Sequence, residues 1–243
     1  MAVDPVVLAL SRSGEPVAHR IAAALGFAVH GREGRVARAD ATFANALDHA
    51  RDLFAAGVPV IGVCASGILI RAVAPLLADK TLEPPVVSVS DDGAVVVPLL
   101  GGHRGANRLA RDIAGALGGT AAVTTAGEVA LGVALDEPPE GWTLGTPHLA
   151  KAAMADLLGG KKAHVCGDEA ARAGWLNALP LAAPGEAEVL IEATTSPAAP
   201  GVLTFHPQRM TLGVGCARNC PAEELDALVT DALAAAELAP GAL

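Results

Sequence analysis

Short apolar runs that end in small polar turns constrain the fold of this chain more than any other feature. Val6–Leu10 is followed by Ser11-Arg12-Ser13-Gly14 and then by a segment of helical character, Glu15–Leu25. Val58–Val63 is followed in the same way by Cys64-Ala65-Ser66-Gly67 and by another apolar helical segment. A continuous apolar run of this length is typical of a strand buried on both faces. Strands that alternate with helices predict an α/β domain with a largely parallel sheet.

The next segments extend this domain. Val86–Ser90 and Ala94–Pro98 flank Asp91-Asp92-Gly93, which is a hairpin signal, so one antiparallel pair is expected in the sheet. Helices are expected over Ala41–Ala56 and Ala106–Leu117, since each is closed by a glycine.

A stretch rich in proline, glycine and acidic residues at 136–141 indicates a domain boundary. We therefore expect an N-terminal α/β domain over residues 1–135, a smaller middle α/β unit over 136–210, and an incomplete further unit over 211–243. The chemistry of the middle unit looks plain. The elements expected after the boundary are helices at His148–Leu158, Gly167–Ala178 and Pro221–Glu237, and strands at Ala163–Cys166, Val189–Ala193, Val202–Phe205 and Thr211–Val214.

Composition excludes several classes of function. The 243 residues carry a formal net charge of -9 and contain 2% aromatic residues, which argues against a nucleic-acid-binding protein. The longest apolar run, Val58–Ile70, is shorter than the ~20 residues that a membrane span needs, and no signal peptide is visible. Four cysteines do not make a disulfide scaffold, so we expect a protein of the reducing cytoplasm. The spacing of Cys216 and Cys220 is a weak metal signal, and no metal site is expected.

A glycine-rich turn, Gly101-Gly102-His103-Arg104-Gly105-Ala106-Asn107, is the strongest candidate for a functional site. The imidazole of His103 titrates near neutrality and suits a general base, and the amide of Asn107 offers both a donor and an acceptor. Backbone N–H groups of Gly101 and Gly102 can approach a ligand closely. The alternative is an ordinary glycine turn with an exposed histidine.

Other candidates follow strands or interrupt apolar segments. Ser11, Ser13, Ser66 and Gly67 lie after strands and before helices, where α/β proteins bind anions, although a capped helix start would look the same. Thr124 and Thr125 end a further strand and could join them. Arg71, Lys80 and Arg104 are candidates for binding carboxylates, with structural ion pairs as the alternative. We expect all these turns to converge in one electropositive cleft.

Several of these segments together resemble the CbiG family of cobalamin biosynthesis, the cobalt-precorrin-5A hydrolases. The resemblance covers most of residues 5–128 and then 210–237, and is loose between them. One departure is that a single glycine, Gly105, separates His103-Arg104 from Ala106-Asn107, where the family usually has two. The matching segments are Gly67–Pro75, Asp79-Lys80, Pro85–Gly93, Leu99–Asn107, Thr124-Thr125-Ala126, and Leu212–Cys216 with Pro221–Glu224.

The resemblance implies that the substrate is a cobalt-containing corrin precursor bearing a lactone. Water would open the lactone and a two-carbon unit would leave as acetaldehyde, a hydrolase reaction on a carbon–carbon bond. It implies no cofactor beyond the cobalt of the substrate, and a precorrin methyltransferase as a partner. Two alternatives stay open within the pathway: a non-catalytic module that binds and hands over corrinoids, or a fragment of a fusion with such a methyltransferase. A third alternative lies outside the pathway: an α/β protein that binds a small anion or a nucleotide.

Overall fold

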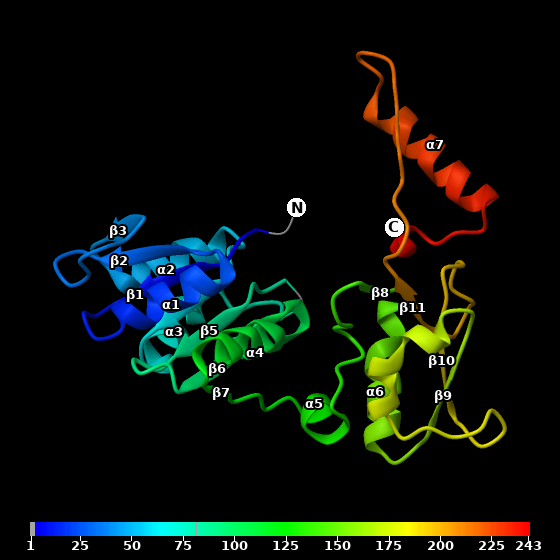
Figure 1. Ribbon diagram of the computed structural model, residues 1–243, viewed down its shortest axis with the longest axis horizontal. Helices are drawn as coiled ribbons and strands as arrows, with labels where there is room; N and C mark the ends of the chain where they lie inside the picture. The colour runs from blue at the N-terminus through cyan, green and yellow to red at the C-terminus, as the bar shows by residue number, and fades with distance from the viewer. Residues whose placement is uncertain (1–2, 81) are drawn as a thin grey trace. The chain divides into compact units, whose positions relative to one another are not determined.

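The computed structural model describes residues 3–80 and 82–243, with every side chain in these ranges except that of His103. The chain divides into two compact units, one ending at Thr125 and one covering Ala126–Leu243 (Figure 1). The predicted α/β class is confirmed, with a largely parallel sheet in the first unit and a smaller sheet in the second.

A seven-stranded sheet forms the centre of the first unit, in the order β3-β2-β1-β4-β5-β6-β7. Strands β1 to β5 are parallel to one another, β6 runs antiparallel to β5, and β7 is parallel to β6. The predicted single antiparallel pair is therefore confirmed. The chain builds the sheet outward from β1 in one direction and from β4 in the other, which makes a topological switch point between these two strands. The strands are β1 Val6–Ala9, β2 Ala28–Arg32, β3 Ala41–Phe43, β4 Val60–Val63, β5 Val86–Val89, β6 Val95–Leu100 and β7 Thr120–Ala121.

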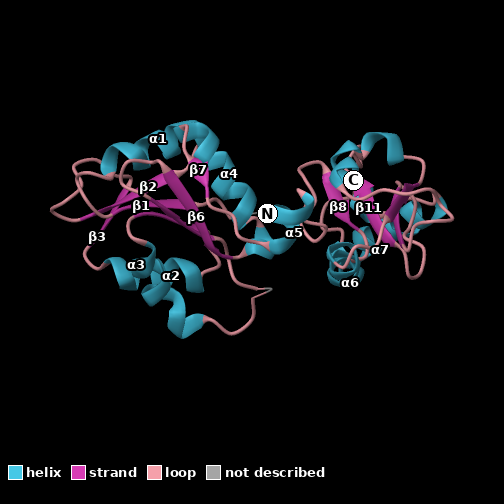
Figure 2. Cartoon of the chain, turned by 90° about the horizontal axis from the view of Figure 1, so that it is seen from below, coloured by secondary structure: helices cyan, strands magenta, loops and turns pink. Residues whose placement is uncertain are grey.

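Helices cover both faces of this sheet (Figure 2). Helices α1, Glu15–Leu25, and α4, Ala106–Leu117, lie on one face, and α2, Ala46–Ala55, and α3, Ser66–Val73, lie on the other. Alternate strand residues supply two separate cores: Val7 of β1 packs with the α1 and α4 side, and its neighbour Leu8 packs with the α2 and α3 side. Such two-sided burial explains the continuous apolar runs in the sequence.

The structure corrects the region between the first two predicted strands. The helix expected over Ala41–Ala56 begins only at Ala46, because the side chain of Asn45 accepts hydrogen bonds from the backbone N–H groups of Leu47 at 2.9 Å and Asp48 at 3.4 Å. The three residues Ala41–Phe43 form the edge strand β3 instead. Strand β2, which the sequence did not indicate, contains His30, Gly31 and Arg32 and so lacks a continuous apolar run.

A four-stranded sheet, in the order β8-β11-β10-β9, forms the second unit. Strands β9, β10 and β11 are parallel, and β8 is antiparallel to β11. Helix α6 packs on this sheet, and its Leu157 lies in one core with Ile191 and Phe205. The elements are α5 Ala126–Leu131, β8 Trp142–Leu144, α6 Pro147–Leu158, β9 Ala163–Cys166, β10 Val189–Ala193, β11 Leu203–Pro207 and α7 Ala222–Ala235.

Two predictions for this unit are wrong. The helix expected over Gly167–Ala178 is replaced by two short 3-10 segments, Ala170–Arg172 and Gly174–Ala178. The strand expected over Thr211–Val214 is exposed chain without regular secondary structure, and it pairs with no strand of the described residues. An apolar alternation needs a neighbouring strand before it becomes a ladder, and this segment has none.

The boundary between the units also differs from the expected one at residue 135. Residues 126–135 belong with the second unit, since Leu135 is fully buried in its core and Leu131 packs against the same core. Residues 136–210 and 211–243, which we expected to be separate, fall within one unit.

Candidate functional site

The candidate residues of the first unit lie on two opposite edges of its sheet. Ser11 and Ser13 follow β1 and Ser66 and Gly67 follow β4, so both turns open at the carboxyl ends of the parallel strands, as predicted. The glycine turn follows β6, whose last residue Leu100 pairs with Val86, the first residue of β5. Because β6 runs antiparallel, the glycine turn lies at the amino ends of the parallel strands. The expectation of a single convergent cleft is therefore wrong.

At the carboxyl edge, the carboxylate of Asp91 joins the ends of β1 and β5. Ser13 donates to its Oδ2 at 2.6 Å and Ser11 donates to the same oxygen at 3.2 Å. A cavity of about 450 Å³ beside this group is lined by Cys64, Ser66 and Asp91, among others. Burial, with a smaller contribution from the negative charge of Asp91, raises the pKa of the Cys64 thiol to about 12. The Cys64 thiol is therefore held in its neutral form at physiological pH, and a neutral thiol is a weak nucleophile.

At the amino edge, the glycine turn has a defined backbone. Gly101 and Gly105 have φ angles of 75° and 98°, which L-amino acids with side chains rarely adopt. A Cβ on Gly101 would lie 2.7 Å from Cα of Pro85, so the turn is pressed against the start of β5. The backbone between these glycines forms the 3-10 turn η2, Gly102–Arg104, which leads into α4. The side chain of His103 lies outside the described part of the structure.

Asn107 is brought together with Thr125 at this edge. Its side chain is buried in the first turn of α4 and donates from Nδ2 to Thr125 Oγ1 at 3.2 Å. Since β7 is parallel to β6, the chain after β7 returns to the same edge as the glycine turn, and Thr124 and Thr125 lie there. They do not join the serine turns as expected, because those are at the other edge.

The chain between α3 and β5 adds an exposed apolar and basic surface beside the glycine turn. Arg104 donates from Nη1 to the carbonyl oxygen of Leu82 at 3.3 Å, which ties this segment to η2. Lys80 is exposed on the same segment. We call the four exposed residues Leu76, Leu77, Lys80 and Leu82 the leucine loop.

Arg71 does not share this surface with Asn107. Its Nη1 donates to the carbonyl oxygen of Gly67 at 2.8 Å, so the guanidinium turns back toward the start of α3 at the carboxyl edge. Helices α3 and α4 also cover opposite faces of the sheet (Figure 2). Arg71 and Asn107 therefore lie at opposite edges of the sheet, on helices that cover its opposite faces.

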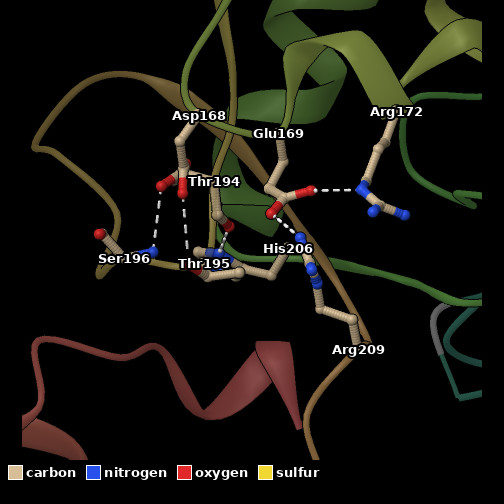
Figure 3. A network of polar contacts seen from close by, with 8 residues as sticks. All are labelled: Asp168, Glu169, Arg172, Thr194, Thr195, Ser196, His206 and Arg209. Carbon is tan, nitrogen blue, oxygen red and sulfur yellow. Dashed lines mark hydrogen bonds and ion pairs between the residues drawn. The ribbon is translucent and has the colours of Figure 1, made fainter.

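A polar network in the second unit was missed at the level of sequence (Figure 3). Glu169 is buried and forms ion pairs with Arg209 and, at 3.2 Å, with Arg172. Thr195 donates to Asp168 at 3.4 Å. These residues follow β9, β10 and β11, so the network ties together the carboxyl ends of three parallel strands. The signal that could have found it is the polar pair directly after each strand, Asp168-Glu169 and Thr194-Thr195.

His206 lies within β11 and adds a further contact at this edge of the sheet. The ring is buried, and its Nδ1 donates to the carbonyl oxygen of Thr194 at 2.7 Å. The buried Glu169 carboxylate and the His206 Nδ1 both have partners within the protein. Among the described residues, no group of three or more histidine, cysteine or acidic side chains could hold a metal ion. The described helices include none that is long and apolar enough to cross a membrane.

Residues 48–128 match the protein-family model described as cobalamin synthesis G N-terminal. The cobalt-precorrin-5A hydrolase of Salmonella typhimurium is 43% identical over 98 residues, which cover 40% of this chain and 27% of that protein. The cobalt-precorrin-5A hydrolase of Priestia megaterium is 26% identical over 204 residues, which cover 75% of this chain and 54% of that protein. Residues 48–128 belong to the CbiG N-terminal family.

The chain thus spans about half the length of one of these relatives and about a quarter of the other. A crystal structure of a proposed cobalamin biosynthesis protein G homolog from Sulfolobus solfataricus aligns with 98% of this chain and 70% of its own, with a TM-score of 0.44 and 18% identity. The glycine turn, Asn107, Thr125 and the leucine loop all lie inside the matched residues 48–128, whereas Ser11 and Ser13 lie outside them.

Proposed function

We propose that this protein acts in corrin-ring biosynthesis by opening the lactone of cobalt-precorrin-5A with water and releasing acetaldehyde. The observation that carries the proposal is the clustering of the glycine turn, Asn107 and the leucine loop at one edge of the sheet, inside the family-matched residues 48–128. The relatives named cobalt-precorrin-5A hydrolase support the substrate class.

The exposed surface suits the two chemical characters of a corrin precursor. Such a molecule combines a broad apolar macrocycle with carboxylates around its rim, and its cobalt is part of the substrate. Leu76, Leu77 and Leu82 offer apolar area to the ring. Lys80 and Arg104 offer cations to the carboxylates, which a chain of net charge -9 must concentrate locally to bind a polyanion.

The reaction needs a base for water and donors for the developing oxyanion. In this proposal His103 removes the proton from water, because an imidazole titrates near neutrality. Backbone N–H groups of Gly101 and Gly102 stabilise the oxyanion, and Asn107, held by Thr125, positions the lactone. Water adds to the lactone carbonyl carbon and the ester C–O bond breaks, which gives a carboxylate and a hydroxyl group. The new hydroxyl group then gives its proton to a base, and the carbon–carbon bond that joins the two-carbon unit to the macrocycle breaks. The electron pair of that bond stays with the macrocycle, and the unit leaves as acetaldehyde.

The direct test is to incubate the full chain with cobalt-precorrin-5A and to follow acetaldehyde with an alcohol-dehydrogenase assay. We expect His103→Ala to lower the rate by roughly a hundredfold or more, as for the loss of a general base. His148→Gln, in the second unit, is the control and should retain the full rate. A His103→Ala variant that releases acetaldehyde at the normal rate would remove His103 from the proposed mechanism.

A second candidate is a module that binds a corrinoid intermediate and hands it to another enzyme of the pathway, such as a precorrin methyltransferase. This candidate is supported by the limited length of the alignments, which span 54% of one named hydrolase and 27% of the other. The activity of those hydrolases can therefore depend on residues outside the aligned part. Saturable corrinoid binding, seen in the visible absorption spectrum, without acetaldehyde release would favour this candidate.

A further inference from the structure

A second hollow lies outside the carboxyl ends of β1 and β2, on the edge away from the proposed reaction site. It has a volume of about 420 Å³, and its walls are Ser11, Arg12, Gly34, Arg35, Val36 and Ala37. All of these residues precede the family-matched range 48–128. We propose that this hollow binds a phosphate group through the guanidinium groups of Arg12 and Arg35. The proposal does not depend on the hydrolase function.

Both cations are available to a ligand. Within the described part of the chain, neither the Arg12 nor the Arg35 side chain forms a hydrogen bond or an ion pair, and both residues are exposed. Arg20 of the neighbouring helix differs, because its Nη2 donates to the carbonyl oxygen of Leu117 at 3.0 Å. Two exposed guanidinium groups without a partner in the protein keep their N–H donors free for an anion in the hollow that both residues line.

The two segments that carry these arginines are fixed relative to each other by Glu15. Its carboxylate is buried and accepts the backbone N–H groups of Ala37 and Arg38, each at 3.0 Å. The hydrogen bond from the Ala37 N–H lowers the pKa of Glu15 most, and the one from the Arg38 N–H lowers it further. The carboxylate therefore stays ionised and continues to accept both hydrogen bonds. The Arg12 turn is fixed in turn because Ser11 Oγ accepts the Gly14 N–H at 3.0 Å. The Glu15 carboxylate therefore binds backbone N–H groups and forms no ion pair with Arg12 or Arg35 in the described structure.

A phosphate suits this arrangement better than a carboxylate. A phosphate monoester carries about -1.5 to -2 charges at neutral pH, which matches two guanidinium groups. Its oxygens point in several directions and can accept donors from two separate loops, whereas one arginine fork already satisfies a planar carboxylate. In open α/β sheets, ligands bind in the crevice outside the carboxyl ends of the strands near the switch point, and β1 borders that point here.

The test is isothermal titration of the full chain at low ionic strength with inorganic phosphate, ribose 5-phosphate and ribose. We expect saturable binding of both phosphates and none of ribose. The double variant Arg12→Gln/Arg35→Gln should weaken binding by at least roughly tenfold, since one charge-assisted hydrogen bond is worth about that much. The control Arg218→Gln, an exposed arginine of the second unit, should bind as the wild type does.

The two phosphate ligands distinguish the source of the group. Ribose 5-phosphate binding at least ten times more tightly than inorganic phosphate would assign an organic phosphate, and equal affinities would assign the free ion. Either result supports the site. The absence of saturable binding by both ligands, or an unchanged affinity in a folded Arg12→Gln/Arg35→Gln variant, would overturn it.

Discussion

Asn107 Nδ2 lies 3.2 Å from Thr125 Oγ1 and donates a hydrogen bond to it. The bond links the start of α4 to the chain that leaves β7, so it closes the crossover between β6 and β7 at the amino edge of the sheet. Asn107 is 5% exposed, which means that its amide has little access to water as a substitute partner. This contact holds the candidate positioning residue of the proposed site in place.

Removal of the Thr125 hydroxyl should show how much the fold depends on its hydrogen bond with Asn107. A Thr125→Val variant leaves the buried Asn107 amide without this partner, and we expect the free energy of unfolding to fall by about 1–2 kcal/mol. Thr124→Val, at the adjacent exposed residue, is the matched control and should cost less than about 0.5 kcal/mol. Urea unfolding followed by circular dichroism measures both. Equal losses in the two variants would mean that the bond adds nothing.

The stability of the first unit should fall in mild acid because of two facing histidines. His30 Nδ1 and His49 Nε2 are 2.8 Å apart, and burial lowers the pKa of both rings below the usual 6.5. Asp40 and Asp52 raise the two pKa values only in part. In the unfolded chain both rings take up protons as the pH falls below 6.5, while the folded chain resists protonation until lower pH. Stability is therefore full above that pH and decreases below it.

The measurement is the urea midpoint at about pH 7.5 and about pH 5.5. The wild type should have the lower midpoint at the acidic pH, and the double variant His30→Gln/His49→Gln should lose most of that difference. His148→Gln is the control and should keep it. If the double variant retains the full pH dependence, this histidine pair is not its source.

Cys64 should be the least reactive of the four thiols in the native protein. Burial raises its pKa to about 12, so little thiolate exists at about pH 8, whereas Cys216 is exposed. Iodoacetamide labelling followed by peptide mass spectrometry should modify Cys216 first and Cys64 only when the first unit unfolds. Rapid labelling of Cys64 in folded protein would contradict the described burial.

The Glu169 network should govern the stability of the second unit. The Glu169 side chain is 8% exposed and the Arg172 side chain is 64% exposed. We expect Glu169→Gln to lower the free energy of unfolding by about 1–3 kcal/mol, because it removes a buried, charge-assisted partner of Arg209. Arg172→Gln should cost less than about 1 kcal/mol, as exposed ion pairs do.

Tryptophan fluorescence reports this unit selectively, because the two tryptophans of the chain, Trp142 and Trp175, both lie in it. A Glu169→Gln variant with an unchanged fluorescence midpoint in urea would show that the network does not stabilise the fold.

The sequence predicted the elements whose pattern follows from burial. Strands β1 and β4 are covered by helices on both faces, so each appears as an apolar run that no other element explains. Strands β2 and β3 were missed because polar residues and edge positions break that pattern. The strand expected over Thr211–Val214 did not form for the opposite reason: its residues are apolar enough, but they have no neighbouring strand in the described part of the chain.

The sequence named candidate residues for the site, and the structure arranges them differently from the expected single cleft. The hairpin at Asp91-Asp92-Gly93 was recognised, and it reverses the chain direction, which sends the glycine turn to the edge away from Ser11 and Ser66. The direction of β6, which follows from this hairpin, was therefore enough to predict the edge at which the glycine turn lies. The pairing of Asn107 with Thr125 could not be predicted in this way, because it depends on β7 being parallel to β6.

The measurement that tests the central claim most directly is a visible-absorption titration with cobalt-precorrin-5A of two double variants, one at each edge of the sheet. Lys80→Gln/Arg104→Gln changes the amino edge, and Ser11→Ala/Ser13→Ala changes the carboxyl edge. We predict that the amino-edge variant loses at least roughly tenfold in corrinoid affinity, since two cations are removed, and that the carboxyl-edge variant binds as the wild type does. The reverse pattern would contradict the account.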